Sequence, residues 1–153
     1  MPTGWRIVKS RYAGTAFDGE GARLHGGRWN SLGTRMVYTA QSRSLAILEI
    51  LVHLQKTGIL ASYSLLAARF DEELIERLDP SRLPERWRGH PAPTAVREIG
   101  DTWITGQTSV VLEVPSAIVE GESNYLINPD HPSSASMIFG DPEPFEFDPR
   151  LLG

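Results

Sequence analysis

The 153-residue chain contains no cysteine. This absence excludes disulfides, thiolate nucleophiles and cysteine-based metal sites, and it fits a reducing compartment. Long apolar runs are missing too: the longest, Leu45 to Leu54, contains Glu49 and His53 and is too short and too polar to span a bilayer. The segment from Met1 to Arg11 lacks the apolar core of a secretory signal. We therefore expect a cytoplasmic protein without a membrane segment.

Three common site motifs are also missing. No pair among the four histidines has the HExxH spacing, so no metal site is predicted. The pair Gly26-Gly27 is not part of a GxGxxG pattern, which argues against a Rossmann site for hydride transfer. Ser116 follows Pro115 at the end of an expected strand but has no GxSxG context, so a hydrolase elbow is not predicted.

Lysine is scarce, because only two of the fifteen basic residues are Lys and the rest are Arg. The net charge is −4, whereas a protein that depends on phosphate contacts for affinity is usually basic. We therefore expect no direct nucleic-acid binding. A few well-placed arginines would still suffice for a small anion, since Arg contacts phosphate bidentately. The excess of Arg over Lys can equally reflect genome base composition.

The length and a hydrophobic fraction of 41% indicate one globular domain, residues 1–153, able to bury about two-thirds of its unfolded surface. Apolar periodicity predicts strands at 5–12, 35–40, 60–70, 109–114 and 124–128, and an edge strand in the tail after Pro142. It predicts helices at 43–56, 71–78 and 94–106, with a glycine-rich loop at 13–34 and another loop at 80–93. This pattern favours an α+β fold with short strands and helices packed outside them.

The helix predicted at 43–56 has the clearest pattern. Ser42 or Ser44 is a candidate N-cap and Gly58 a candidate C-terminal cap. Apolar residues occupy nearly all sides of this helix, which predicts burial on most of them.

Glu49 lies in the middle of that apolar helix. One interpretation places it on a narrow solvent-facing stripe; the other places it in a pocket, where an unpaired carboxylate costs free energy unless it has a function. His53, four residues later, shares its helical face and is either a surface partner or a second polar group in the pocket.

Two further residues allow both a structural and a functional interpretation. Arg28 in HGGRWN is either a loop arginine in a surface ion pair or a bidentate clamp for phosphate or carboxylate. Tyr38 in MVYTA is either a half-buried strand aromatic or a ring that flanks a ligand. The residues themselves leave these alternatives open.

Several segments in a fixed order carry more information than any one motif. HGGRWNSLG, MVYTA, LAILEILVHL, IGDTW, VPSAI, NYLINPDHP and FDPRLL together resemble the RES domain over nearly the whole chain. The family is named after an Arg, a Glu and a Ser, which correspond here to Arg28, Glu49 and Ser116.

The resemblance implies a fold similar to ADP-ribosyltransferases of the diphtheria-toxin type, with a small split β-core and surrounding helices. It implies a toxin of a bacterial toxin–antitoxin pair, with NAD+ as substrate, no separate cofactor, and a helix-turn-helix antitoxin as partner in an oligomeric complex. Arg28, Tyr38 and Glu49 would form the catalytic site, with Ser116 and Asn124 also contacting the substrate. The acceptor stays open between water, phosphate and a protein side chain, and a non-catalytic antitoxin-binding module is the alternative from another class.

Overall fold

The computed structural model describes residues 1–54 and 61–152. Within them, eight strands form one curved sheet in the order β4-β5-β6-β2-β1-β3-β7, with β8 also paired to β3. The β4–β5 pair is parallel and the other described pairs are antiparallel. The strands are β1 (Thr3–Lys9), β2 (Val37–Ala40), β3 (Tyr63–Arg69), β4 (Ile75–Arg77), β5 (Val111–Pro115), β6 (Ser123–Ile127), β7 (Ile138–Phe139) and β8 (Glu143–Phe145).

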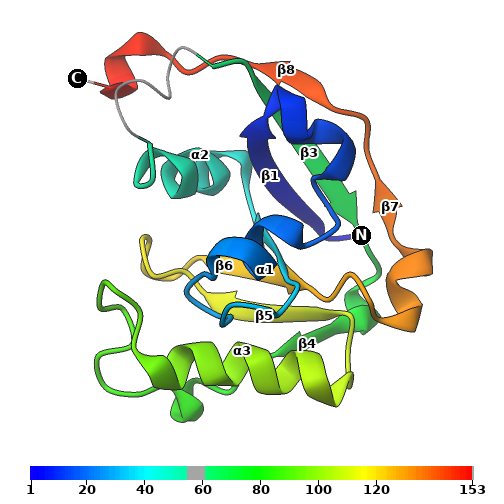
Figure 1. The fold of residues 1–153 in the computed structure, drawn as a ribbon, viewed down its shortest axis with the longest axis vertical. Coiled ribbons are helices and arrows are strands. Elements are labelled where there is room, and N and C mark those ends of the chain that lie inside the picture. The colour runs from blue at the N-terminus through cyan, green and yellow to red at the C-terminus, as the bar shows by residue number, and fades with distance from the viewer. Residues whose placement is uncertain (55–60, 153) are drawn as a thin grey trace.

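The described α-helices are α1 (Glu20–His25), α2 (Arg43–Leu51) and α3 (Thr94–Gly106), and several short 3-10 segments occur along the chain. Figure 1 shows α2 beside β1 in the upper half of the view and α3 beneath β4 and β5 in the lower half. The expected α+β class with short strands and outer helices is therefore confirmed.

Helix α3 shows how the apolar spacing fixes the packing. Val96, Ile99 and Trp103 lie on one face at helical spacing, as the sequence predicts, and all three are buried. They pack against Leu112 and Val114 of β5 in the largest apolar cluster. The strands expected at 35–40, 109–114 and 124–128 are confirmed as β2, β5 and β6.

Several predicted elements differ from the structure. The segment 71–78 was expected to be a helix, but it is a single 3-10 turn, Glu72–Leu74, followed by β4. The acids favour a helical first turn, and pairing of β4 with β5 then imposes an extended backbone. The expected irregular loop at 13–34 contains α1 and part of a 3-10 helix, Ser10–Thr15.

Helix α2 is shorter and more exposed than predicted. It ends at Leu51 rather than at Lys56, and the candidate cap Gly58 lies outside the described residues. Ser42 is the N-cap, because its hydroxyl accepts a hydrogen bond from the Leu45 backbone N–H at 3.0 Å. The prediction that the helix is buried on most sides is wrong. Leu45 and Ala46 are buried, whereas Leu48 and Val52 are exposed. One face of α2 therefore packs on the core, and the helix is exposed at other positions such as Leu48.

Candidate active site

Helix α2 directs Glu49 away from the open solvent. Its Oε1 atom is buried and has no hydrogen-bond partner among the described residues. Burial raises the pKa of Glu49, although Asn124, His53, Arg28 and Ser116 all act in the opposite direction. One carboxylate oxygen of the half-buried Glu49 is therefore withdrawn from solvent, which argues against the solvent-stripe interpretation, and the polar and charged groups that act on its pKa lie near it.

Ser116 and Asn124 approach Glu49 from the ends of two adjacent strands. Ser116 follows β5 and is fully buried, and its hydroxyl oxygen accepts hydrogen bonds from the backbone N–H groups of Ile118 and Val119, both at 3.0 Å. The Asn124 amide on β6 donates to the Thr39 carbonyl at 3.2 Å. Both side chains lower the pKa of Glu49, yet neither forms a hydrogen bond of ordinary geometry with Oε1.

Arg28 is half-buried in a tight turn that follows α1. Its Nη1 donates to the backbone carbonyls of Trp87 and Gly89 at 2.9 and 3.0 Å, so Arg28 anchors the loop that precedes α3. Burial lowers the pKa of Arg28, whereas the charges of Glu49 and Tyr38 raise it. In the described part of the chain Arg28 forms no ion pair, which excludes the surface-pair interpretation there.

Tyr38 lies on β2, beside the turn that carries Arg28. Its hydroxyl donates to Asn30 Oδ1 at 2.5 Å and accepts from the Trp29 backbone N–H at 3.0 Å. Burial raises the pKa of Tyr38, and the nearby charges of Arg28 and Arg6 lower it. Electrostatic interactions thus connect Arg28 with both Tyr38 and Glu49, and Glu49 with Ser116 and Asn124.

Arg6 is a residue that the sequence reasoning missed. Its Nη1 donates to the Tyr38 carbonyl at 3.0 Å, but its buried Nε has no partner among the described residues. Burial lowers the pKa of Arg6, and the charges of Asp18 and Tyr38 oppose this effect without any ion pair in the described residues. The one signal in the sequence is a basic residue inside the strand-like run WRIVK, which an exposed strand face would explain equally well.

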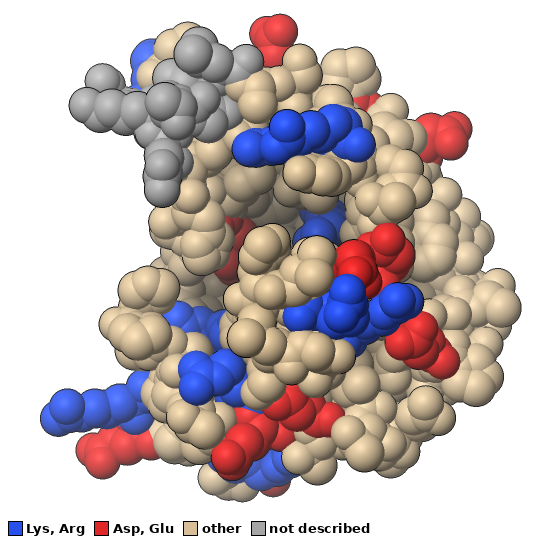
Figure 2. Space-filling view, viewed as in Figure 1, with Lys and Arg blue, Asp and Glu red and all other residues tan. Residues whose placement is uncertain are grey.

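The space-filling view shows a hollow between the upper part of the molecule, with α2 and β1, and the lower part, with α3 (Figure 2). Basic and acidic atoms are visible inside it (Figure 2). Such a recess suits an anionic ligand, because cationic donors act strongly where water is partly excluded.

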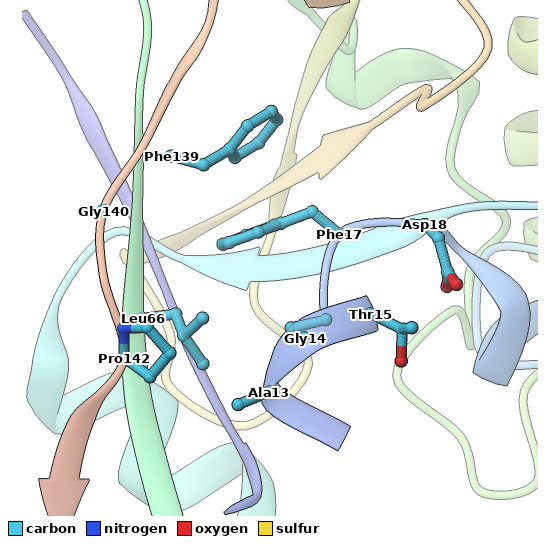
Figure 3. Close-up of a pocket in the computed structure, with 10 residues that line it drawn as sticks. Ala13, Gly14, Thr15, Phe17, Asp18, Leu66, Phe139, Gly140 and Pro142 are labelled. Atoms are coloured by element: carbon cyan, nitrogen blue, oxygen red, sulfur yellow. The ribbon is translucent and has the colours of Figure 1, made fainter. Parts of the chain in front are cut away.

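A separate cavity of about 430 Å³ lies between the 3-10 helix after β1 and the edge of the sheet (Figure 3). The rings of Phe17 and Phe139 stack there, 4.5 Å apart, above Leu66. None of the five predicted site residues lines this cavity, and Asp18 is its one ionisable lining residue, so it is not the candidate site.

The described residues offer neither a metal centre built from His, Cys, Asp or Glu ligands nor a membrane-spanning helix. Within 1–54 and 61–152, no group of three or more His, Cys, Asp or Glu side chains is arranged to hold a metal ion. In the same ranges, no helix has the length and apolar character needed to cross a membrane.

The fold is that of a known bacterial toxin. The chain matches a structure described as the crystal structure of the M. tuberculosis MbcT–MbcA toxin–antitoxin complex, with a TM-score of 0.77 over 95% of this chain and 84% of the other. The sequences are 17% identical, so this likeness establishes the α+β fold with its curved sheet.

Sequence comparison identifies the family. The RES domain model matches residues 3–148, and the chain belongs to this family. A protein named Toxin Res from Yersinia enterocolitica is 40% identical over 148 residues, covering 96% of this chain and 97% of the relative. A protein named Prs ADP-ribosylating toxin, from a Sphingobium species, is 36% identical over 153 residues, covering 97% and 95% respectively.

Proposed function

We propose that this protein is the toxin of a bacterial toxin–antitoxin pair and that it consumes NAD+ by cleaving the bond between nicotinamide and ribose. The observation that carries the proposal is the buried carboxyl oxygen of Glu49 that has no hydrogen bond among the described residues, close enough to Arg28 for the two charges to interact. A buried carboxyl group without a partner is destabilising, and such groups cluster at functional sites. The relative named an ADP-ribosylating toxin supports chemistry on NAD+.

The bond to be broken requires little help at its leaving group. Nicotinamide in NAD+ is already cationic, so it departs with the bonding electron pair as a neutral molecule and needs no general acid. Positive charge then develops on the ribose, as in the oxocarbenium-like transition state of glycoside cleavage. The Glu49 carboxylate stabilises that charge, either beside the ribose hydroxyls or by orienting the acceptor, whose oxygen bonds to the ribose carbon and loses its proton.

Two arginines supply the positive charge for the pyrophosphate of NAD+. Arg28 Nη1 is occupied by two carbonyls, but its Nε and Nη2 have no hydrogen bond in the described residues and are the groups we assign to phosphate. Arg6, with its buried and unpartnered Nε, is the second phosphate ligand in this proposal. The ring of Tyr38 flanks the nicotinamide.

In this proposal Ser116 and Asn124 form hydrogen bonds to the Glu49 carboxylate and hold it in position. Ser116 accepts two backbone hydrogen bonds, so its one hydroxyl proton is left for the Glu49 carboxylate. Because Ser116 is fully buried, we place it behind Glu49 as a positioning residue. Asn124 is only partly buried and acts on the pKa of Glu49, and we assign its amide to both Glu49 and the bound ribose.

The acceptor defines the second candidate function. With water or phosphate as acceptor the protein degrades NAD+; with a protein side chain it is a mono-ADP-ribosyltransferase, which the name of the Sphingobium relative favours. The reaction centre is the same in both cases. A non-catalytic antitoxin-binding module is the remaining alternative, and it offers no reason for a buried Glu49 oxygen without a hydrogen bond.

The partner that we propose is a cognate antitoxin of the helix-turn-helix type, in an oligomeric complex located in the cytoplasm. The structural relative comes from a toxin–antitoxin complex, which supports a protein partner of this kind. The acidic net charge of −4 assigns any DNA contact to the antitoxin rather than to this chain.

The experiment is a time course of NAD+ concentration with the purified protein, with and without phosphate, beside Glu49→Ala. Loss of NAD+ that requires Glu49 supports the proposal, and the product, ADP-ribose or its phosphorylated form, identifies the acceptor. Full turnover by Glu49→Ala would refute the role of Glu49. No NAD+ loss, together with label transfer from NAD+ to a protein of a bacterial lysate, would identify the transferase; the absence of NAD+ binding would indicate the binding module.

A further inference from the structure

Asn30 is the most highly connected polar side chain near the candidate site. It is fully buried, and its amide nitrogen donates to the backbone carbonyls of Ala22, Ser31 and Thr34 at 2.9, 3.1 and 3.1 Å. Its Oδ1 accepts the hydroxyl proton of Tyr38 at 2.5 Å. One side chain therefore joins α1, the glycine-rich segment and β2, and every polar atom of its amide is used.

The hydroxyl of Tyr38 is equally committed to the protein. It donates its only proton to Asn30 and accepts from the Trp29 backbone N–H, so it has no proton available for a substrate. Tyr38 is half-buried, and what it can still present to a ligand is its ring.

Arg28 depends on the same arrangement, because it sits in the turn between the bridged residues Gly27 and Asn30. A Cβ on Gly27 would lie 2.5 Å from the Tyr38 hydroxyl oxygen, so the turn packs directly on that oxygen. Asn30 closes the turn from one side and Tyr38 supports it from the other. The direction of Arg28 and the plane of the Tyr38 ring are therefore set by one hydrogen-bond network.

We propose that Asn30 is a positioning residue that fixes Arg28 and the ring of Tyr38 relative to one another, and that the Tyr38 hydroxyl serves this network and takes no part in proton transfer. The inference rests on the proposed function of the site and adds how its two substrate-facing groups are held. It assigns a role to Asn30, which the motif HGGRWN contains but the sequence reasoning did not use.

The test is a double-mutant cycle with Tyr38→Phe, Asn30→Ala and the double variant, measured as kcat/KM for NAD+ consumption, or for label transfer if that is the activity. We expect each single variant to lose about tenfold, because the ring and Arg28 lose their alignment. The double variant should be no worse than Asn30→Ala alone, since both changes remove one shared contact. The pH profile of Tyr38→Phe should keep the shape of the wild-type profile. Tyr12→Phe, at a tyrosine that is 52% exposed, is the matched control and should lose nothing.

Several outcomes would overturn the inference. Complete loss of activity in Tyr38→Phe, or loss of a limb of its pH profile, would show that the hydroxyl does chemistry. Multiplicative losses in the double variant would show that the two residues act independently. If Asn30→Ala is less stable but has an unchanged kcat/KM, the role of Asn30 is only structural and the inference is wrong.

If Asn30→Ala fails to fold, Asn30→Leu replaces it in the cycle, because it keeps most of the side-chain volume and removes the acceptor for Tyr38. Tyr38→Phe tests the hydroxyl on its own in any case. A wild-type chain that neither binds nor uses NAD+ refutes the proposed function and the positioning role with it. An active wild-type chain with an additive cycle refutes the positioning role alone.

Discussion

At Glu49, burial works against the stability of the fold. The carboxyl group is removed from water, its Oε1 has no partner among the described residues, and burial raises its pKa. The folded chain therefore holds this proton more tightly than the unfolded chain does. Between the ordinary Glu pKa and the raised one, the folded state binds more protons, so the free energy of unfolding falls as pH rises through that window.

The variant Glu49→Gln tests whether the buried carboxylate supports activity at the expense of stability. We expect the variant to lose at least about a hundredfold in NAD+ turnover, because the amide cannot stabilise positive charge on the ribose. It should also be more stable than the wild type at neutral pH, because the neutral side chain avoids the cost of burying a charge. Urea unfolding of both proteins from pH 4 to 8 measures the difference in their free energies of unfolding. Parallel stability–pH curves for the two proteins would show that Glu49 titrates normally.

The pH dependence of activity follows from the same group. If ionised Glu49 is the active form, the acidic limb of kcat/KM, which reports the free enzyme, should lie above the ordinary Glu pKa of about 4.3. As pH decreases through the raised pKa of Glu49, the carboxylate becomes protonated and activity falls. A profile that stays flat down to pH 4.5 would contradict it.

Arg6 provides the second prediction for a single side chain. Arg6→Met removes a cation whose buried Nε has no partner, and we expect NAD+ affinity to fall by about 10- to 100-fold, the usual effect of one charge-assisted hydrogen bond. Arg11→Met, at an exposed arginine five positions along the chain, is the matched control. Isothermal titration with NAD+ measures both. Equal affinities for the two variants would remove Arg6 from the phosphate site.

Among the elements, α3 matters to the site through one close contact. A Cβ on Gly100 would lie 1.7 Å from the Trp29 carbonyl oxygen, so α3 packs against the backbone of the turn that carries Arg28. Asp101, the next residue, accepts a hydrogen bond from the Ser31 backbone N–H at 2.9 Å. A helix and a glycine-rich turn are thus locked together at their main chains.

Gly100→Ala should therefore be destabilising despite the higher helix propensity of Ala. We expect a loss of about 1–3 kcal/mol from overpacking and a fall in NAD+ turnover, because the turn with Arg28 must move. Gly106→Ala in the same helix meets nothing within 4 Å and should be neutral or slightly stabilising, by up to about 1 kcal/mol. Thermal unfolding and NAD+ turnover compare the two variants. Equal melting temperatures would show that α3 can shift away from the turn.

At the scale of the whole molecule, we predict the effect of the protein on bacterial growth and on the cellular NAD+ level. Expression of the wild-type chain in a bacterial host should arrest growth and lower cellular NAD+, if water or phosphate is the acceptor, whereas Glu49→Gln should do neither. NAD+ levels that stay constant during arrest would point to a protein acceptor. Equal toxicity of the two proteins would separate the growth effect from the site proposed here.

The sequence determined those elements whose apolar pattern is strong. The buried face of α3 and the strands β2, β5 and β6 follow from apolar spacing. A serine at the start of α2 predicts a cap there, and the structure selects Ser42 over Ser44. The order of short motifs also predicted the RES family, because several motifs in a fixed order are far more specific than one.

Only the tertiary structure decided the rest. Residues 75–77 are a strand because β5 lies alongside them, and α2 is buried on one face because the sheet covers only that face. The contacts around Glu49 and Asn30 bring together residues from distant parts of the chain. The burial of Arg6 Nε without a hydrogen-bond partner likewise depends on how the elements pack. Local spacing carries no information about such contacts, since burial and hydrogen-bond partners depend on which elements pack together.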